Sequence, residues 1–114
     1  MKKGLIEVTG GKVWYKIVGE DKSNTPLLVL HGGSSEFTIS GTLKSFERAE
    51  DLNNINLSVL YTCGRYDEAT PELTAYYKSL TPNAEIVIFE DASHEHHLEK
   101  KEEFIKTVRR FLNK

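Results

Sequence analysis

Three short β-rich runs, each followed by turn-forming or polar residues, constrain the fold of this chain most. They lie at residues 27–30, 57–62 and 86–89. Short, mainly apolar runs of this kind are typical of strands that are buried on both faces of a parallel sheet. Helical patterns lie between and after them, so strands and helices alternate from residue 27 onward. This alternation predicts an α/β domain with a largely parallel sheet.

The helices are predicted from the spacing of apolar residues and from end signals. Over residues 42–52 apolar side chains recur about once per turn, and Thr42 suits the N-cap. Thr70 and Pro71 mark the start of a second helix that runs to about residue 80. The last helix, at 98–112, carries one apolar stripe, with acidic residues first and basic residues last, as the helix dipole favours.

Two segments ahead of this pattern, 4–8 and 12–18, predict an antiparallel hairpin. The second alternates in hydropathy, and Thr9-Gly10-Gly11 between them supplies the positive φ angles of a tight turn. At 114 residues the chain has the length of one domain. We therefore expect a single domain over 1–114, built as a three-layer α/β sandwich with about five strands and three helices.

Composition excludes several kinds of partner. Fifteen basic and 17 acidic residues leave a net charge of −2, which gives no electrostatic reason to expect nucleic acid or an anionic membrane. The longest wholly apolar stretch is far too short to span a membrane, and the N-terminus lacks the long apolar region of a signal peptide. The single Cys63 cannot form an internal disulfide, which fits a reducing compartment. We expect a cytoplasmic protein.

Polar residues follow each of the three runs, at the sheet edge where parallel strands place catalytic groups. HGG occupies 31–33, Asp67 lies in GRYDE, and His94 lies in DASH. One β-α-β unit brings Asp67 and His94 together, so we expect a hydrogen bond like that between the acid and histidine of a serine hydrolase. The alternative reading of Asp67 is a turn former. The chain has no G-x-S-x-G elbow to hold a serine.

Four segments resemble the proline iminopeptidases, which are α/β-hydrolase serine peptidases that release an N-terminal residue, often proline, from short peptides. The segments are GLIEVTGGKVWYKIVGE, PLLVLHGG, EFTISGTL and CGRYDEATP. The resemblance implies a reduced α/β-hydrolase fold, with the central block that holds the serine elbow and most of the cap absent between HGG and Ser34. It also implies that Asp67 is the triad acid and His94 the triad base.

The same resemblance assigns further residues by position. Gly32 and Gly33 match the loop that helps to form the oxyanion hole. Glu36 and Glu68 match acidic residues that hold the free α-amino group of the substrate. A short peptide or amino-acid amide is the implied ligand, and no cofactor is implied. Ser34 stands where the family usually has a proline after HGG.

Three functions are compatible with these residues. The first is a hydrolase scaffold without peptidase activity, because the nucleophile is missing. The second is a minimal serine hydrolase or esterase that uses Ser34 or Ser35, although neither follows a sharp strand-to-helix turn. The third is a module that binds peptide amino termini. Cys63 is better explained as a buried small side chain than as a nucleophile.

Two expectations concern metal and assembly. The histidines at 94, 96 and 97 do not have the spacing that points three ligands at one ion, so we expect no biological metal site. Sheet edges left by a missing central block need hydrogen-bond partners, so we expect a homodimer.

Overall fold

The computed structural model describes residues 1–19, 26–28, 45 and 47–114. Its contacts divide the chain into two compact units, Met1–His31 and Gly32–Lys114, which are described separately below. The strands of the first unit are β1 (Lys2–Val8) and β2 (Gly11–Ile17). The elements of the second unit are η2 (Ala49–Asn54), β3 (Val59–Gly64), α1 (Pro71–Leu80), β4 (Ala84–Phe89), α2 (His96–Glu99) and α3 (Lys101–Leu112).

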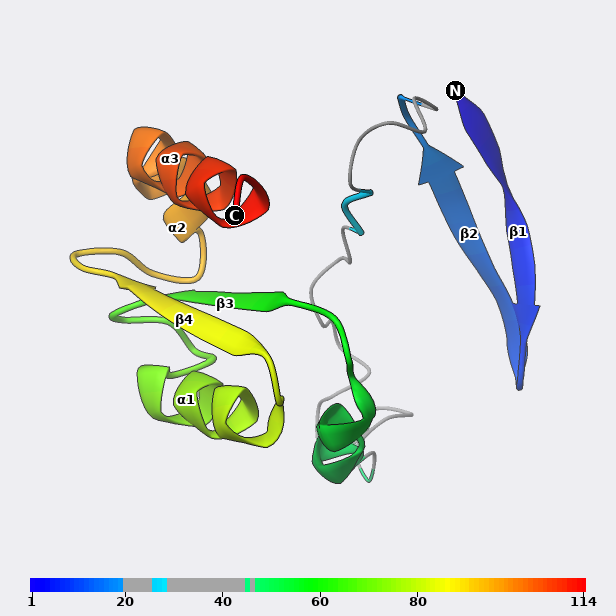
Figure 1. Cartoon of the computed structure of the whole chain (residues 1–114), viewed down its shortest axis with the longest axis horizontal. Helices are drawn as coiled ribbons and strands as arrows, with labels where there is room; N and C mark the ends of the chain where they lie inside the picture. The colour runs from blue at the N-terminus through cyan, green and yellow to red at the C-terminus, as the bar shows by residue number, and fades with distance from the viewer. Residues whose placement is uncertain (20–25, 29–44, 46) are drawn as a thin grey trace. The chain divides into compact units, whose positions relative to one another are not determined.

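Strands β1 and β2 form the predicted antiparallel hairpin (Figure 1). Val8 pairs with Gly11 across the turn, and Gly10 has a φ of 92°, a conformation that glycine adopts without strain. Gly4 lies opposite Tyr15, whose ring occupies the space that a side chain at residue 4 would need. This pairing fixes which residues share a face of the hairpin.

The second unit contains a parallel strand pair that confirms the predicted α/β class. Strands β3 and β4 pair in parallel from Val59 with Ala84 to Gly64 with Phe89. Helix α1 connects them and covers one face of the pair, whereas α2 and α3 lie on the other face (Figure 1). The Thr70 hydroxyl accepts a hydrogen bond from the Leu73 N–H, so the predicted N-cap of α1 is confirmed.

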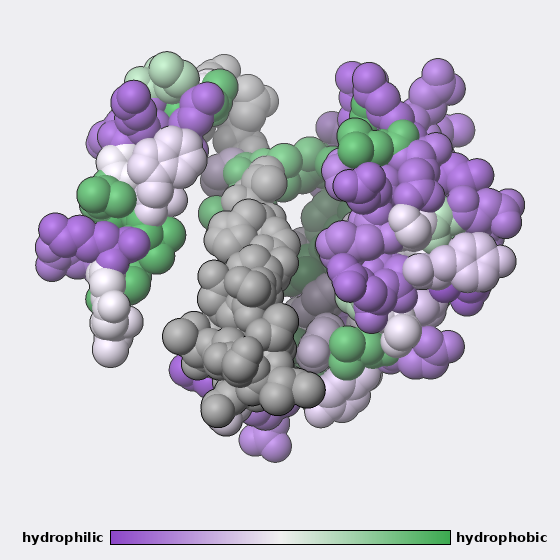
Figure 2. Space-filling view, turned by 180° about the vertical axis from the view of Figure 1, so that it is seen from behind, coloured by the Kyte–Doolittle hydropathy of each residue, from purple (hydrophilic) through white to green (hydrophobic). Residues whose placement is uncertain are grey.

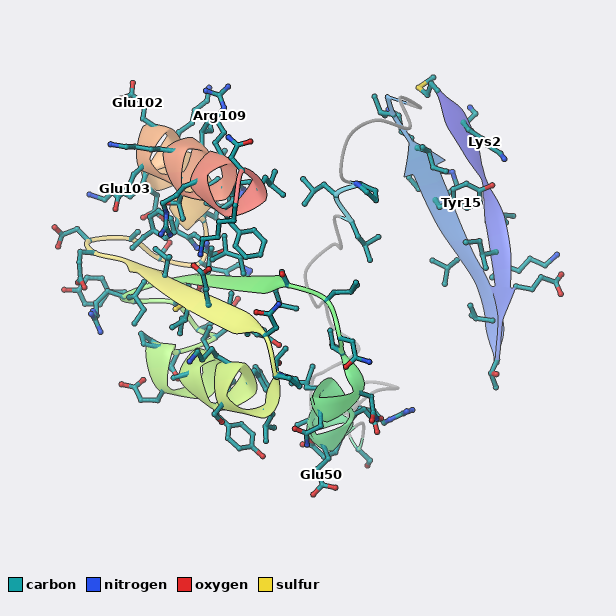
Figure 3. All side chains as sticks on the ribbon, in the orientation of Figure 1. Lys2, Tyr15, Glu50, Glu102, Glu103 and Arg109 are labelled. Atoms are coloured by element: carbon teal, nitrogen blue, oxygen red, sulfur yellow. The ribbon has the colours of Figure 1, made fainter. Side chains whose placement is uncertain are left out.

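Helix α3 packs through its apolar stripe and presents its charges to solvent. Phe104 lies 5.9 Å from the ring of Phe89 at the end of β4. Glu102 and Arg109 point away from the sheet (Figure 3). On the face in Figure 2 polar residues predominate over this unit. Near the helix end Arg110 and Lys114 form ion pairs with Glu85 of β4, which tie the exposed side of α3 to the strand.

The helix that we predicted over 42–52 is corrected in its described part. Residues 49–54 form a 3₁₀ helix, and most of the earlier part lies outside the described residues. The half-buried side chains here are Ala49, Leu52 and Ile55. A spacing of three matches the three residues per turn of a 3₁₀ helix better than the 3.6 of an α-helix. The backbone bonds from Asp51 to Arg48 and from Ile55 to Leu52 have the same spacing.

The strand that we predicted over 27–30 lies only partly within the description. Leu27 and Leu28 are not in a strand, and the next two residues lie outside the described part of the chain. The final helix differs from the prediction at its start, because a short α2 precedes α3 and the two meet at Lys100. No helix in the described ranges is long and apolar enough to cross a membrane.

Candidate active site

Asp67 lies in the turn after β3, and its carboxylate is almost fully buried. Its Oδ1 accepts a hydrogen bond from the Ala69 N–H at 2.9 Å, and its Oδ2 accepts one from the Gly64 N–H at 3.3 Å. The exposed fraction of the side chain is 2%. Asp67 therefore stabilises its own turn, and its carboxylate still has a lone pair to accept another donor.

His94 lies in the turn after β4, beside Asp67. Its Nδ1 lies 2.8 Å from Asp67 Oδ1, so the predicted hydrogen bond between these side chains is confirmed. A carboxylate can only accept, so Nδ1 donates the proton. The His94 side chain is 58% exposed, and among the described residues its Nε2 has no hydrogen-bond partner. The ring is thus fixed on one side and open to a reactant on the other.

The two side chains shift each other's pKa in opposite directions. The hydrogen bond from His94 to Asp67 and the negative charge of Asp67 raise the pKa of His94. The charges of Glu68 and Glu95 add to this increase. Burial raises the pKa of Asp67, but the hydrogen bonds from His94, Ala69 and Gly64 outweigh burial and leave that pKa below its ordinary value.

These shifts predict how stability depends on pH. The folded pKa of His94 lies above its unfolded value. The stability that His94 contributes to the fold is therefore fully present at pH values below the unfolded pKa, and it is lost as the pH rises through the folded pKa. The folded pKa of Asp67 lies below its unfolded value. The stability that Asp67 contributes to the fold is therefore present at pH values above the unfolded pKa, and it is lost as the pH falls through the folded pKa. We expect Asp67→Asn to reduce the free energy of unfolding most between about pH 4 and pH 6.5.

Urea unfolding of the wild type and of Asp67→Asn across this range measures the effect. The difference between the two proteins should shrink as pH rises beyond the folded pKa of His94. His94→Gln serves as the matched variant, because it removes the titrating partner and should leave a weaker pH dependence. A difference that is the same at pH 5 and pH 9 would contradict the assigned ion pair.

The remaining predicted site residues are only partly described. Gly32, Gly33 and Glu36, and the alternative nucleophiles Ser34 and Ser35, lie outside the described residues. Glu68 is exposed and directly follows Asp67. The oxyanion and amine-binding roles therefore stay predictions.

Cys63 is buried, as predicted. It is fully inaccessible at the end of β3, and burial raises the pKa of its thiol. A thiol with a raised pKa is a weak nucleophile at neutral pH. Among the described residues, no group of three histidine, cysteine or acidic side chains is arranged to hold a metal ion.

Sequence reasoning missed the residues that hold the two turns in place. Arg65, after β3, forms two hydrogen bonds to Glu90, after β4, at 3.0 and 2.5 Å. The Ser93 N–H and hydroxyl both donate to the carboxylate of Glu99. The sequence carries no local signal for the second contact, because a capping box pairs a serine with a glutamate three residues later and Glu99 is six residues after Ser93.

Comparisons with known proteins extend this local picture. No family model matches the chain. The chain is 44% identical over 90 residues to a proline iminopeptidase of Heyndrickxia coagulans, a match that covers 79% of this chain and 31% of the relative. It is 33% identical over 81 residues to a proline iminopeptidase of Saccharolobus solfataricus, covering 71% of this chain and 26% of the relative. The chain thus spans less than a third of these relatives.

Solved structures give the same result. The crystal structure of a proline iminopeptidase from Mycobacterium smegmatis matches with a TM-score of 0.63 and 36% identity, over 71% of this chain and 27% of that one. The structure of VinJ matches with a TM-score of 0.63 and 32% identity over the same shares. Together with an acid and a histidine after consecutive parallel strands, these matches define an α/β-hydrolase. Within that class, the chain belongs to the proline iminopeptidase family.

Proposed function

We propose that this chain carries the acid and base of a proline iminopeptidase site and that, on its own, it does not release proline. The Asp67–His94 hydrogen bond is the observation that supports the first half of the proposal. In a serine hydrolase the acid holds Nδ1–H of the histidine, so that Nε2 can take the proton of the serine hydroxyl. His94 has this arrangement, with Nδ1 bound and Nε2 without a partner in the described structure.

The second half of the proposal depends on the nucleophile. Covalent catalysis needs a hydroxyl that is hydrogen-bonded to the base and that faces oxyanion donors. No G-x-S-x-G segment occurs in these 114 residues to present one. An acid and base without that hydroxyl can polarise a bound water or hydroxyl group, but they cannot form an acyl-enzyme. Short peptides with a free amino terminus are the proposed ligands, by analogy with the family.

We expect the purified chain to release p-nitroaniline from proline p-nitroanilide no faster than buffer does. Enzymes that lose only the nucleophile can keep a residual acceleration of about 10³-fold over water, through an intact oxyanion hole and binding site. We infer that the family's central segment is absent from this chain, so we expect less. Absorbance at saturating substrate measures the release.

The controls separate the chain's own activity from contamination. His94→Ala removes the base, whereas His97→Ala removes an exposed histidine next to His96. Release that persists in His97→Ala and disappears in His94→Ala would contradict the proposal. Phenylmethylsulfonyl fluoride followed by intact-mass measurement would then identify Ser34 or Ser35 as the modified residue.

A further inference from the structure

A second histidine lies beside the same carboxylate as His94. His96 begins α2, and its side chain is 10% exposed, whereas that of His94 is 58% exposed. Its Nδ1 is 3.8 Å from Asp67 Oδ2, which is too far for a hydrogen bond. His96 is therefore close to the site without being a member of the Asp67–His94 pair.

Both ring nitrogens of His96 have partners in the neighbouring elements. Nδ1 lies 3.3 Å from the carbonyl oxygen of Ser93, and Nε2 lies 3.0 Å from Oγ1 of Thr62. A carbonyl oxygen can only accept, so Nδ1 carries the proton. In the neutral ring Nε2 then accepts a hydrogen bond from the Thr62 hydroxyl. The ring thus links strand β3 to the backbone of the residue just before His94.

Packing leaves the His96 ring little freedom to rotate. It stacks on Phe89 with ring centres 5.3 Å apart and an angle of 23°, and Phe104 meets it edge-on at 5.9 Å. Phe89 is fully buried. Thr62 faces this side of the strand pair because its neighbour Cys63 faces Thr74 of α1, as the alternation of side chains in a strand requires.

We propose that His96 is a positioning residue, which ties the Ser93–His94 turn to β3 so that His94 meets Asp67. The inference deepens the proposed function and rests on it. The Ser93 carbonyl belongs to the peptide bond that leads directly into His94, so a shift of that carbonyl moves the His94 ring. Glu99 holds the N–H and hydroxyl of Ser93, and His96 holds its carbonyl oxygen. Ser93 is thereby fixed on three sides.

The titration of the His94 ring by nitrogen-15 NMR tests this role. Asp67→Asn gives the reference, in which the pKa of His94 should fall because its acceptor has lost its charge. His96→Leu keeps the apolar packing but loses both hydrogen bonds, and we expect most of the same fall in pKa. His96→Asn should restore the wild-type titration, because an asparagine amide can donate to Ser93. His97→Leu is the matched control and should leave the pKa of His94 unchanged.

Two further variants keep the test decisive if His96→Leu does not fold. Thr62→Val removes the hydroxyl that holds Nε2 with little change of shape, and it should lower the pKa of His94 in part. His96→Gln carries its amide near the place of Nε2 rather than Nδ1, so it can keep the contact with Thr62 but not the bond to Ser93, and it should behave like His96→Leu. An unchanged His94 titration in the folded variants, beside a clear shift in Asp67→Asn, would overturn the role of His96 and leave the proposed site intact. No shift in Asp67→Asn would instead overturn the proposed site.

Discussion

Replacing Gly64 with alanine is expected to destabilise the second unit strongly. A Cβ atom at this position would lie 2.2 Å from the Ser93 carbonyl oxygen and 2.3 Å from that of Ala92. Both obstacles are backbone atoms, which no side-chain rotation can remove. Overpacking in a core costs about 1–3 kcal/mol when side chains can adjust, so we expect a loss of at least about 3 kcal/mol here. Urea unfolding followed by circular dichroism measures it.

The matched control is Gly11→Ala in the hairpin. A Cβ atom at Gly11 would meet no atom within 4 Å, so the same chemical change should alter the free energy of unfolding by less than about 1 kcal/mol. Trp14 is the only tryptophan in the chain and lies in β2, so its fluorescence reports on the hairpin. If Gly64→Ala unfolds at the same urea concentration as the wild type, the close approach of Ala92 and Ser93 to β3 is wrong.

The Phe89→Ala variant should lose nearly as much stability. Phe89 is completely buried at the end of β4 and packs against His96 and Phe104. Truncation of a buried phenylalanine costs about 3–5 kcal/mol, and a domain of this size has only about 5–15 kcal/mol in total. The same substitution also removes the surface against which His96 stacks. We therefore expect a lower urea midpoint together with a fall in the pKa of His94.

Leu98→Ala provides the comparison for Phe89→Ala. Leu98 lies on the adjacent α2, and 61% of it is exposed, so its truncation should change stability by no more than about 0.5 kcal/mol. Equal losses in the two variants would show that the Phe89 contacts do not form the core of this unit.

Elements with local signals could be predicted from the sequence. The cap at Thr70 and the proline at N1 define α1, and two short apolar runs correspond to β3 and β4 within two residues. The 3₁₀ helix was mistaken for an α-helix, because apolar residues three apart fit both periods in a short segment. Helix α2 was not separated from α3, because the buried position of His96 depends on partners from distant parts of the chain.

The candidate site shows the same division between local and distant signals. Asp67 and His94 could be predicted because each lies in the turn after a strand, and parallel strands end at one edge. The close packing against Gly64 could not, because it depends on the path of the turn after β4, where Asp91 has a φ of 54°. Asp is one of the few residues that adopt this left-handed conformation readily, but its presence alone does not determine the conformation.

The short separation between Asp67 and His94 has a consequence for folding order. Only 27 positions separate them, and the chain between them forms one helix and one strand of a single β-α-β unit. The entropy lost on closing a loop grows with its length, by about 0.6 kcal/mol for each doubling, so a nearby pair is joined at lower cost than a distant one. The acid and base can thus come together as soon as β3, α1 and β4 have formed.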